Sequence, residues 1–251
     1  INVGLVGSEM CIRDSHRADF TSVVNEVNKN SINYGESSLG KSKSVQIEFV
    51  SANPTGPLHV GHGRGAAYGD AIGRILSVSG YKVEKEYYIN DAGRQIDILT
   101  ASVFIKVFKK HFTDFFPTNA YKGSYIEDIS IIFIDKNNPE LSVDVSLLKD
   151  GLPIDEEKEI DEVILRIKKN EPSLWFNLKD FALNEVLTSI KDDLKLFNVS
   201  FDQWFYESSL GDVSDKESKV AAAINTLKDK ELAYEEKGAI WLNTSSSGDD
   251  K

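Results

Sequence analysis

The hydrophobic positions between residues 45 and 80 change from a period of two to a helical period. A buried strand is predicted over residues 45–50, where the alternating apolar positions are Val45, Ile47 and Phe49, closed by Val50. The buried stripe of the helix that follows is expected at Ala66, Ala67, Ala71, Ile72, Ile75 and Leu76. A Pro/Gly turn over residues 51–58 separates the two elements, and Gly80 suits the helix end.

The same alternation follows once more. Residues 82–89 are predicted to form a second strand, with Val83 and Tyr87 on one face. Asp91 can cap the next helix, whose buried stripe is expected at Ile96, Leu99, Val103 and Val107. This order predicts parallel βαβ units in an α/β fold, a doubly wound, Rossmann-like parallel sheet. Such sheets bind ligands at the carboxyl ends of their strands.

Four segments are predicted along the chain. They are an N-terminal remnant and linker (1–44), the first half of the α/β fold (45–110), a mainly helical insertion (111–196) and a return toward the sheet (197–251). Residues 1–15 show no periodicity, and Gly7–Ser15 resembles translated sequencing-adapter sequence, so we assign this stretch no function. The remnant has one helical stripe, Phe20, Val23, Val24 and Val27, which ends near Asn30.

The insertion and the return segment have their own patterns. Helical stripes are Tyr125, Ile126, Ile129 and Phe133; Ile160, Val163, Ile164 and Ile167; and Phe181, Val186, Leu187, Ile190 and Leu194 in a helix opened near Pro172. A strand is expected over Val199–Phe205. A helix with the stripe Val220, Ile224 and Leu227, capped near Ser214, and a hairpin joining residues 232–234 to 239–242 should follow.

Residues 35–42 match the G-x-x-x-x-G-K-[ST] pattern of a phosphate loop through Gly35, Gly40, Lys41 and Ser42. A working phosphate loop follows a strand and opens a helix, whose N-terminus binds the phosphates. In this sequence a helix precedes the loop and a strand follows it. We therefore expect an exposed linker with no helix beginning at Lys41.

Composition and charge narrow the class of protein. The 251 residues are 41% hydrophobic and 27% charged, which is ordinary for a soluble globular protein. The net charge of −11 is uneven, because residues 45–110 carry +2 and residues 111–251 carry −13. No basic face of the kind expected of a generic nucleic-acid binder is visible. Cys11 is the only cysteine, and no membrane-length apolar run or leader is visible, so we expect a cytoplasmic protein.

Two histidines lie at the predicted start of the first α/β helix, in the run His59-Val60-Gly61-His62. Their spacing places both rings on one side of the first turn, beside its unpaired N–H groups. Such donors suit a polyphosphate whose negative charge rises during reaction. Taken alone, the pair could equally be a solvated helix face. A zinc site would need further ligands that the sequence does not supply, so we expect no metal site in the protein.

The whole run from Ala52 to His62, Ala-Asn-Pro-Thr-Gly-Pro-Leu-His-Val-Gly-His, resembles the signature of class I aminoacyl-tRNA synthetases in the form found in arginyl-tRNA synthetases. Tyr88-Ile-Asn-Asp-Ala-Gly-Arg-Gln95 resembles the second signature of that family. Two supporting matches are Phe201-Asp-Gln-Trp-Phe205 and Gly238-Ala-Ile-Trp-Leu242, the latter leading to Gly248-Asp-Asp-Lys251. The resemblance runs from about Gly35 to the last residue.

The resemblance implies ATP-dependent activation of L-arginine and its transfer to tRNA(Arg), with Mg²⁺ bound to the ATP. It makes His59 and His62 the catalytic donors to the phosphates, and Gly61 and Gly63 the further ATP-binding residues. The residues implied to bind arginine are Glu48, Ser51, Asn53, Asn90, Asp91 and Gln95, with Gly93 beside them. A carboxylate at Glu48 suits a guanidinium group.

Each assignment has a structural alternative. Glu48 could simply face solvent from a half-exposed strand, and Asp91 could be only a helix cap. Gly61 and Gly63 could do no more than make the start of the helix flexible. We expect Trp204, Trp241 and the pair Tyr87-Tyr88 to belong to the core rather than to contact a base.

The resemblance also implies a truncated fragment of a monomeric enzyme. The second ATP signature, the anticodon-binding domain and most of the N-terminal tRNA-contacting domain of the family are missing, so we expect little or no activity. Three alternatives remain open at this point. They are another class I synthetase or H-x-G-H nucleotidyltransferase, a non-catalytic nucleotide-binding fragment, and a phosphate-loop NTPase that uses Lys41.

Overall fold

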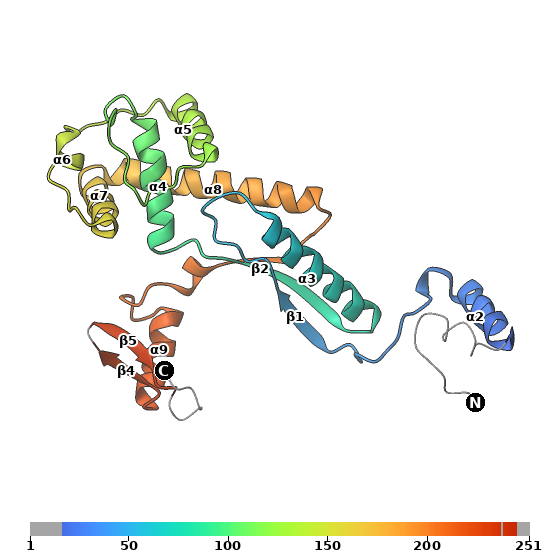
Figure 1. The fold of residues 1–251 in the computed structure, drawn as a ribbon. Coiled ribbons are helices and arrows are strands. Elements are labelled where there is room, and N and C mark those ends of the chain that lie inside the picture. The colour runs from blue at the N-terminus through green and yellow to red at the C-terminus, as the bar shows by residue number, and fades with distance from the viewer. Residues whose placement is uncertain (1–16, 237, 245–251) are drawn as a thin grey trace, which may run out of the picture. The chain divides into compact units, whose positions relative to one another are not determined.

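The computed structural model describes residues 17–236 and 238–244 (Figure 1). In that part of the chain, one compact unit contains residues 17–45 and 71–83, and the other contains residues 46–70 together with the described residues from 84 onward. Cys11, the adapter-like stretch and Gly248–Lys251 lie outside the described residues. Every residue proposed for the site belongs to the second unit.

The sheet is parallel and three-stranded, in the order β1 (Ser44–Glu48), β2 (Lys82–Ile89) and β3 (Gln203–Tyr206). Strands β2 and β3 pair in parallel, with Tyr87 opposite Trp204. The helix α3 (Val60–Val78) connects β1 to β2. The predicted α/β, Rossmann-like fold is therefore confirmed. Two strand limits were wrong: β1 ends at Glu48, before Val50, and β3 begins at Gln203 rather than at Val199.

Helix α3 packs through small residues, and only part of the predicted stripe is buried. Ala66 is buried and Ile72 and Leu76 are half-buried, whereas Ala67, Ala71 and Ile75 are exposed. The other buried positions are Gly69, Asp70 and Gly73. A Cβ at Gly69 would lie 2.2 Å from the ring of Phe49, so the helix approaches the residue that follows β1 too closely for a side chain there. The helix ends as predicted, because Gly80 adopts φ +86.

The segment between β2 and β3 is helical, as predicted. Its helices are α4 (Arg94–Val107), α5 (Ser124–Asn137), α6 (Ser146–Lys149), α7 (Glu156–Asn170) and α8 (Pro172–Leu196), and the short α6 had no sequence signal (Figure 1). Helix α4 is buried on almost every side because α5, α7 and α8 all pack on it. Its fully buried side chains include Leu99 and Phe104. The three predicted helical stripes belong to this core, although Tyr125 and Phe181 are only partly buried.

The return segment contains the 3-10 helix η2 (Glu207–Leu210), α9 (Lys219–Asp229) and an antiparallel hairpin of β4 (Ala233–Glu236) and β5 (Ala239–Leu242). The predicted hairpin is confirmed. The prediction that Trp241 lies in the core is wrong, because it is 53% exposed and every residue of β5 is exposed in the described part of the chain. Trp204 and Tyr87, in contrast, stack on each other with ring centroids 4.6 Å apart.

Ser218, and not Ser214, caps helix α9. Its hydroxyl accepts a hydrogen bond from the Ala221 N–H and donates to the Asp212 carbonyl. Replacing Ser218 by alanine should therefore lower the stability of α9 by about 1 kcal/mol. Native-state hydrogen exchange of the α9 amides measures this. Ser214→Ala is the matched control, and equal effects of the two changes would contradict the capping assignment.

The first unit contains α2 (Arg17–Asn30), the 3-10 helix η1 (Ser31–Asn33) and the glycine-containing loop that follows. The predicted helix is confirmed, but its apolar stripe is exposed: Phe20, Val23, Val24 and Val27. The loop N–H groups of Ser37, Gly40 and Ser42 donate to the carbonyls of residues 78–80 at the end of α3. As predicted, no helix begins at Lys41, and the loop over residues 35–42 is exposed except at Gly40, which is buried.

Candidate active site

The chain leaves β1 through a strained turn. Val50 and Ser51 both adopt left-handed backbone conformations, with φ +66 and +38, which cost about 1–3 kcal/mol each in residues with a side chain. Two hydrogen bonds donated by residues of β2 hold this turn in place. The Tyr88 N–H donates to Ser51 Oγ at 3.1 Å, and the buried Tyr87 hydroxyl donates to the Ala52 carbonyl at 3.0 Å. Burial raises the pKa of Tyr87 to about 12, so its hydroxyl remains a donor at neutral pH.

His59 and His62 lie side by side where α3 begins. Their rings stack with centroids 3.7 Å apart, and neither ring is packed into the core. His59 Nδ1 accepts from the Gly61 N–H at 3.1 Å, and His62 Nδ1 accepts from the His59 N–H at 3.2 Å. A nitrogen that accepts these bonds carries no proton, so each neutral ring has its proton on Nε2. The turn thus fixes both imidazoles as Nε2–H donors.

The two glycines of this helix start differ in their surroundings. A Cβ at Gly61 would lie 3.0 Å from the His59 ring, so glycine at this position lets the imidazole bind back on the helix start. A Cβ at Gly63 would meet no atom within 4 Å. The space over Gly63 is therefore open to a ligand that approaches the backbone.

The pKa of His62 is lowered from its usual value of 6.5, first by burial and second by the charge of the neighbouring His59. A lowered pKa in the folded protein means that neutral His62 stabilises the fold above about pH 6.5 and that this contribution is lost as the pH falls through the folded-state pKa. We expect an NMR titration of His62 to have its midpoint below 6.5, and His59→Gln to move that midpoint upward. A wild-type midpoint at or above 6.5 would contradict the described environment.

The segments after β1 and β2 meet at the same end of the sheet. Asn53 Nδ2 donates to Gln95 Oε1 at 2.7 Å, which joins the first signature to the second. The Asn90 amide, oriented to satisfy its neighbours, donates to the Ala92 carbonyl at 2.9 Å and to the Glu207 carboxylate at 2.8 Å. Three strands therefore contribute to one edge, as expected for the carboxyl ends of a parallel sheet.

Asp91 does not cap helix α4, so that prediction was wrong. Gly93, with φ +83, occupies the N-cap position and offers no side chain. The Asp91 carboxylate instead accepts from both the N–H and the hydroxyl of Ser208. These bonds tie the segment after β2 to the segment after β3, and the carboxylate is occupied by them.

Glu207 and Ser208 lie at the candidate site, where they bond to Asn90 and Asp91, and the sequence analysis did not name them. Both follow directly on β3, at the same edge as the two signatures. Their position after the predicted strand Val199–Phe205 was the only available signal, because polar residues at the carboxyl end of a parallel strand are candidates for a ligand site.

This edge of the sheet is electronegative. The pKa of Tyr88 is raised, first by burial and then by the carboxylates of Glu207, Glu48 and Asp91. Glu48 itself is exposed on the face of β1 opposite Ile47. Exposure is also what a solvent-facing glutamate would show, so a substrate role for Glu48 remains a prediction. The combined charge of three carboxylates suits a cationic ligand.

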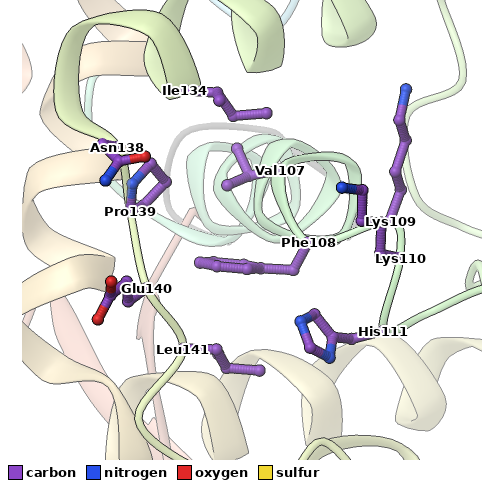
Figure 2. Close-up of a pocket in the computed structure, with 10 residues that line it drawn as sticks. All are labelled: Val107, Phe108, Lys109, Lys110, His111, Ile134, Asn138, Pro139, Glu140 and Leu141. Atoms are coloured by element: carbon purple, nitrogen blue, oxygen red, sulfur yellow. The ribbon is translucent and has the colours of Figure 1, made fainter.

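A pocket of about 480 Å³ lies away from this edge, at the carboxyl ends of α4 and α5. Figure 2 shows the Phe108 ring among its lining residues, with His111 and Leu141 nearby. It shares no residue with the two signatures. Within residues 17–236 and 238–244, no cluster of three or more His, Cys, Asp or Glu could hold a metal ion, and no helix has the length and apolarity to cross a membrane.

The chain is similar to known proteins over most of its length. The family model for tRNA synthetases class I (R), catalytic domain, matches residues 23–249. The chain is 42% identical over 241 residues to an arginine–tRNA ligase of Thioalkalivibrio sulfidiphilus, and 43% identical over 237 residues to one of Vesicomyosocius okutanii. These matches cover 92% and 91% of the chain, which spans 40% of the length of each relative.

A solved structure from Campylobacter jejuni, described as an arginyl-tRNA synthetase, has a similar fold. It superimposes with a TM-score of 0.71 at 30% sequence identity. The similarity covers 94% of this chain and 45% of that protein.

Proposed function

The chain belongs to the family of class I tRNA synthetase (R) catalytic domains, and on this premise we propose that it contains the amino-acid-activating site of an arginine–tRNA ligase. The observation that supports this most is the joining of the two signatures by the Asn53–Gln95 hydrogen bond, next to a histidine pair fixed as Nε2–H donors. Residues 45–110 and 197–251 would form parts of the catalytic fold, and residues 111–196 its helical insertion.

In the proposed reaction, the arginine carboxylate attacks the α-phosphate of ATP. Arginyl-adenylate forms as the bond from the α-phosphate to the β-phosphate breaks and pyrophosphate leaves. A hydroxyl at the 3′ end of tRNA(Arg) then attacks the arginyl carbonyl, its proton is released, and AMP leaves as the bond from the carbonyl to the phosphate oxygen breaks. Charge shifts toward the phosphate oxygens in the first step, so positioned donors lower its barrier.

ATP would bind over the start of α3. The Nε2–H groups of His59 and His62 would donate to its phosphates, and the positive end of the helix dipole would add to their effect. Gly61 and Gly63 would allow the nucleotide to approach the backbone, and the open space over Gly63 supports this for the second glycine. Mg²⁺ would enter with ATP as part of the substrate.

Arginine would bind at the electronegative edge. Glu48 would pair with the guanidinium group, which presents two parallel N–H donors to a carboxylate. Asn53 would hold the α-amino end with help from Ser51, and Gln95 would orient Asn53 through their hydrogen bond. Asn90 and Asp91 would line the pocket, held in place by the bonds of the Asn90 amide nitrogen to Glu207 and of the Asp91 carboxylate to Ser208.

Ligand-dependent melting of this chain tests whether the site binds both substrates. We expect ATP with Mg²⁺ and L-arginine each to raise the melting temperature. A response to ATP but not to arginine would favour the alternative of a non-catalytic nucleotide-binding fragment. The absence of a response to both ligands in a folded chain would contradict the proposed site.

A further inference from the structure

The helical insertion contacts the turn that separates the proposed arginine-binding and ATP-binding residues. Tyr125, in the first turn of α5, donates its hydroxyl to the Thr55 carbonyl at 2.7 Å. Thr55 lies between Asn53 and His59 in the chain. Burial raises the pKa of Tyr125 to about 12, so this donor persists at neutral pH.

A further contact acts on the same turn. Gly56 lies against Tyr125, where an added Cβ would be 3.2 Å from the phenol carbon and oxygen. The turn is therefore held at two consecutive residues, through the Thr55 carbonyl and a close backbone contact at Gly56.

The element that holds the turn is itself firmly packed. Ile126, Ile129 and Phe133 are buried in the core formed with α4 and α8. A cavity of about 190 Å³ borders both Tyr125 and Pro57. Side-chain packing therefore leaves empty space beside the turn and does not fix its position. The hydrogen bond from the Tyr125 hydroxyl to the Thr55 carbonyl fixes it.

We propose that Tyr125 is a positioning residue that fixes the turn over residues 53–58 from the helical insertion. The contact stands on the geometry alone, and its effect on substrate binding rests on the proposed function. In this role the insertion sets the distance between Asn53 and the histidine pair, although it contributes no group to the chemistry.

Hydrogen exchange of the turn tests the proposal in the chain as it exists. The reporting amides are those of Thr55, His59 and Gly61, each of which donates a defined hydrogen bond. Tyr125→Phe keeps the ring and removes the donor, and should speed exchange at these amides by roughly threefold to tenfold. The amides of Leu99 and Phe104 in α4 should exchange as in the wild type.

Two other variants complete the design. Gly56→Ala keeps the hydroxyl but presses a methyl group against the Tyr125 ring, and should speed exchange of the same amides. Tyr234→Phe, on β4, is a matched control that should leave them unchanged. Unchanged turn exchange in Tyr125→Phe would overturn the proposal. Equal acceleration throughout α4 and α5 would also overturn it, because the hydroxyl would then serve the fold only.

ATP affinity separates this proposal from the proposed function. If the wild-type chain binds ATP, Tyr125→Phe should weaken binding by a factor similar to its effect on exchange, and an unchanged affinity would overturn the positioning role. If the wild-type chain does not bind ATP, the proposed function fails, while the exchange result still decides whether Tyr125 fixes the turn.

Discussion

His62→Ala should slow arginyl-adenylate formation by roughly 10²–10³-fold and leave the affinity for arginine nearly unchanged. Its Nε2–H is held as a donor at the start of α3, and in the proposed reaction its bond to a phosphate oxygen would strengthen as charge accumulates there. An interaction that grows in the transition state affects kcat more than substrate binding. The measurement is single-turnover formation of the adenylate. It uses a longer enzyme that contains this sequence and has the full length of its relatives.

Two variants control this experiment. His62→Gln retains an amide donor and should keep more activity than His62→Ala. His111→Ala removes a histidine from the helical insertion and should leave the rate as it is. A His62→Ala rate within twofold of the wild type would exclude the catalytic role.

Glu48→Gln should lower kcat/KM for arginine by roughly tenfold to a hundredfold, with little change in ATP binding. The substitution keeps the shape of the side chain and removes the charge that would face the guanidinium group. The neighbouring carboxylates of Glu207 and Asp91 still contribute negative charge, but each is oriented by hydrogen bonds to its own neighbours, so the direct pairing with the guanidinium group would be lost. Pyrophosphate exchange at varied arginine concentration, with tRNA present, provides the measurement.

Glu84→Gln is the matched control for Glu48→Gln. Glu84 is an exposed carboxylate on β2 whose partner is Gln46, outside the proposed site. It should leave arginine use unchanged. Equal kinetic constants for Glu48→Gln and the wild type would remove Glu48 from the substrate site and return it to the solvent-facing alternative.

The fold was largely predictable because periodicity reports burial. The stripe that begins at Ile96 and the one that begins at Ile160 both correspond to buried helix faces. The prediction held only in part for α3, where close packing on Phe49 requires glycine at position 69. Ala66 of the predicted stripe is buried but Ile75 is exposed, because the glycines of the packed face carry no hydrophobic signal.

The site was predictable only where its residues are close in sequence. The run from Glu48 to Gly63 could be interpreted directly, since a strand, a turn and a helix start are local features. The partner of Asp91 is 117 residues away at Ser208, and local cap chemistry gave the wrong answer. No sequence pattern predicted the left-handed backbone at Val50 either. Val50 is β-branched, and the hydrogen bond from the Tyr88 N–H on β2 to Ser51 holds the turn in this conformation.

The amino-acid dependence of ATP–pyrophosphate exchange tests the assignment of arginine most directly. The measurement uses a longer enzyme that contains this sequence and has the full length of its relatives. tRNA(Arg) is present, and each of the standard amino acids is supplied in turn. We expect exchange with arginine alone, and its loss in the His62→Ala variant. Exchange supported by a different amino acid, or exchange with arginine that His62→Ala leaves intact, would contradict the proposed site.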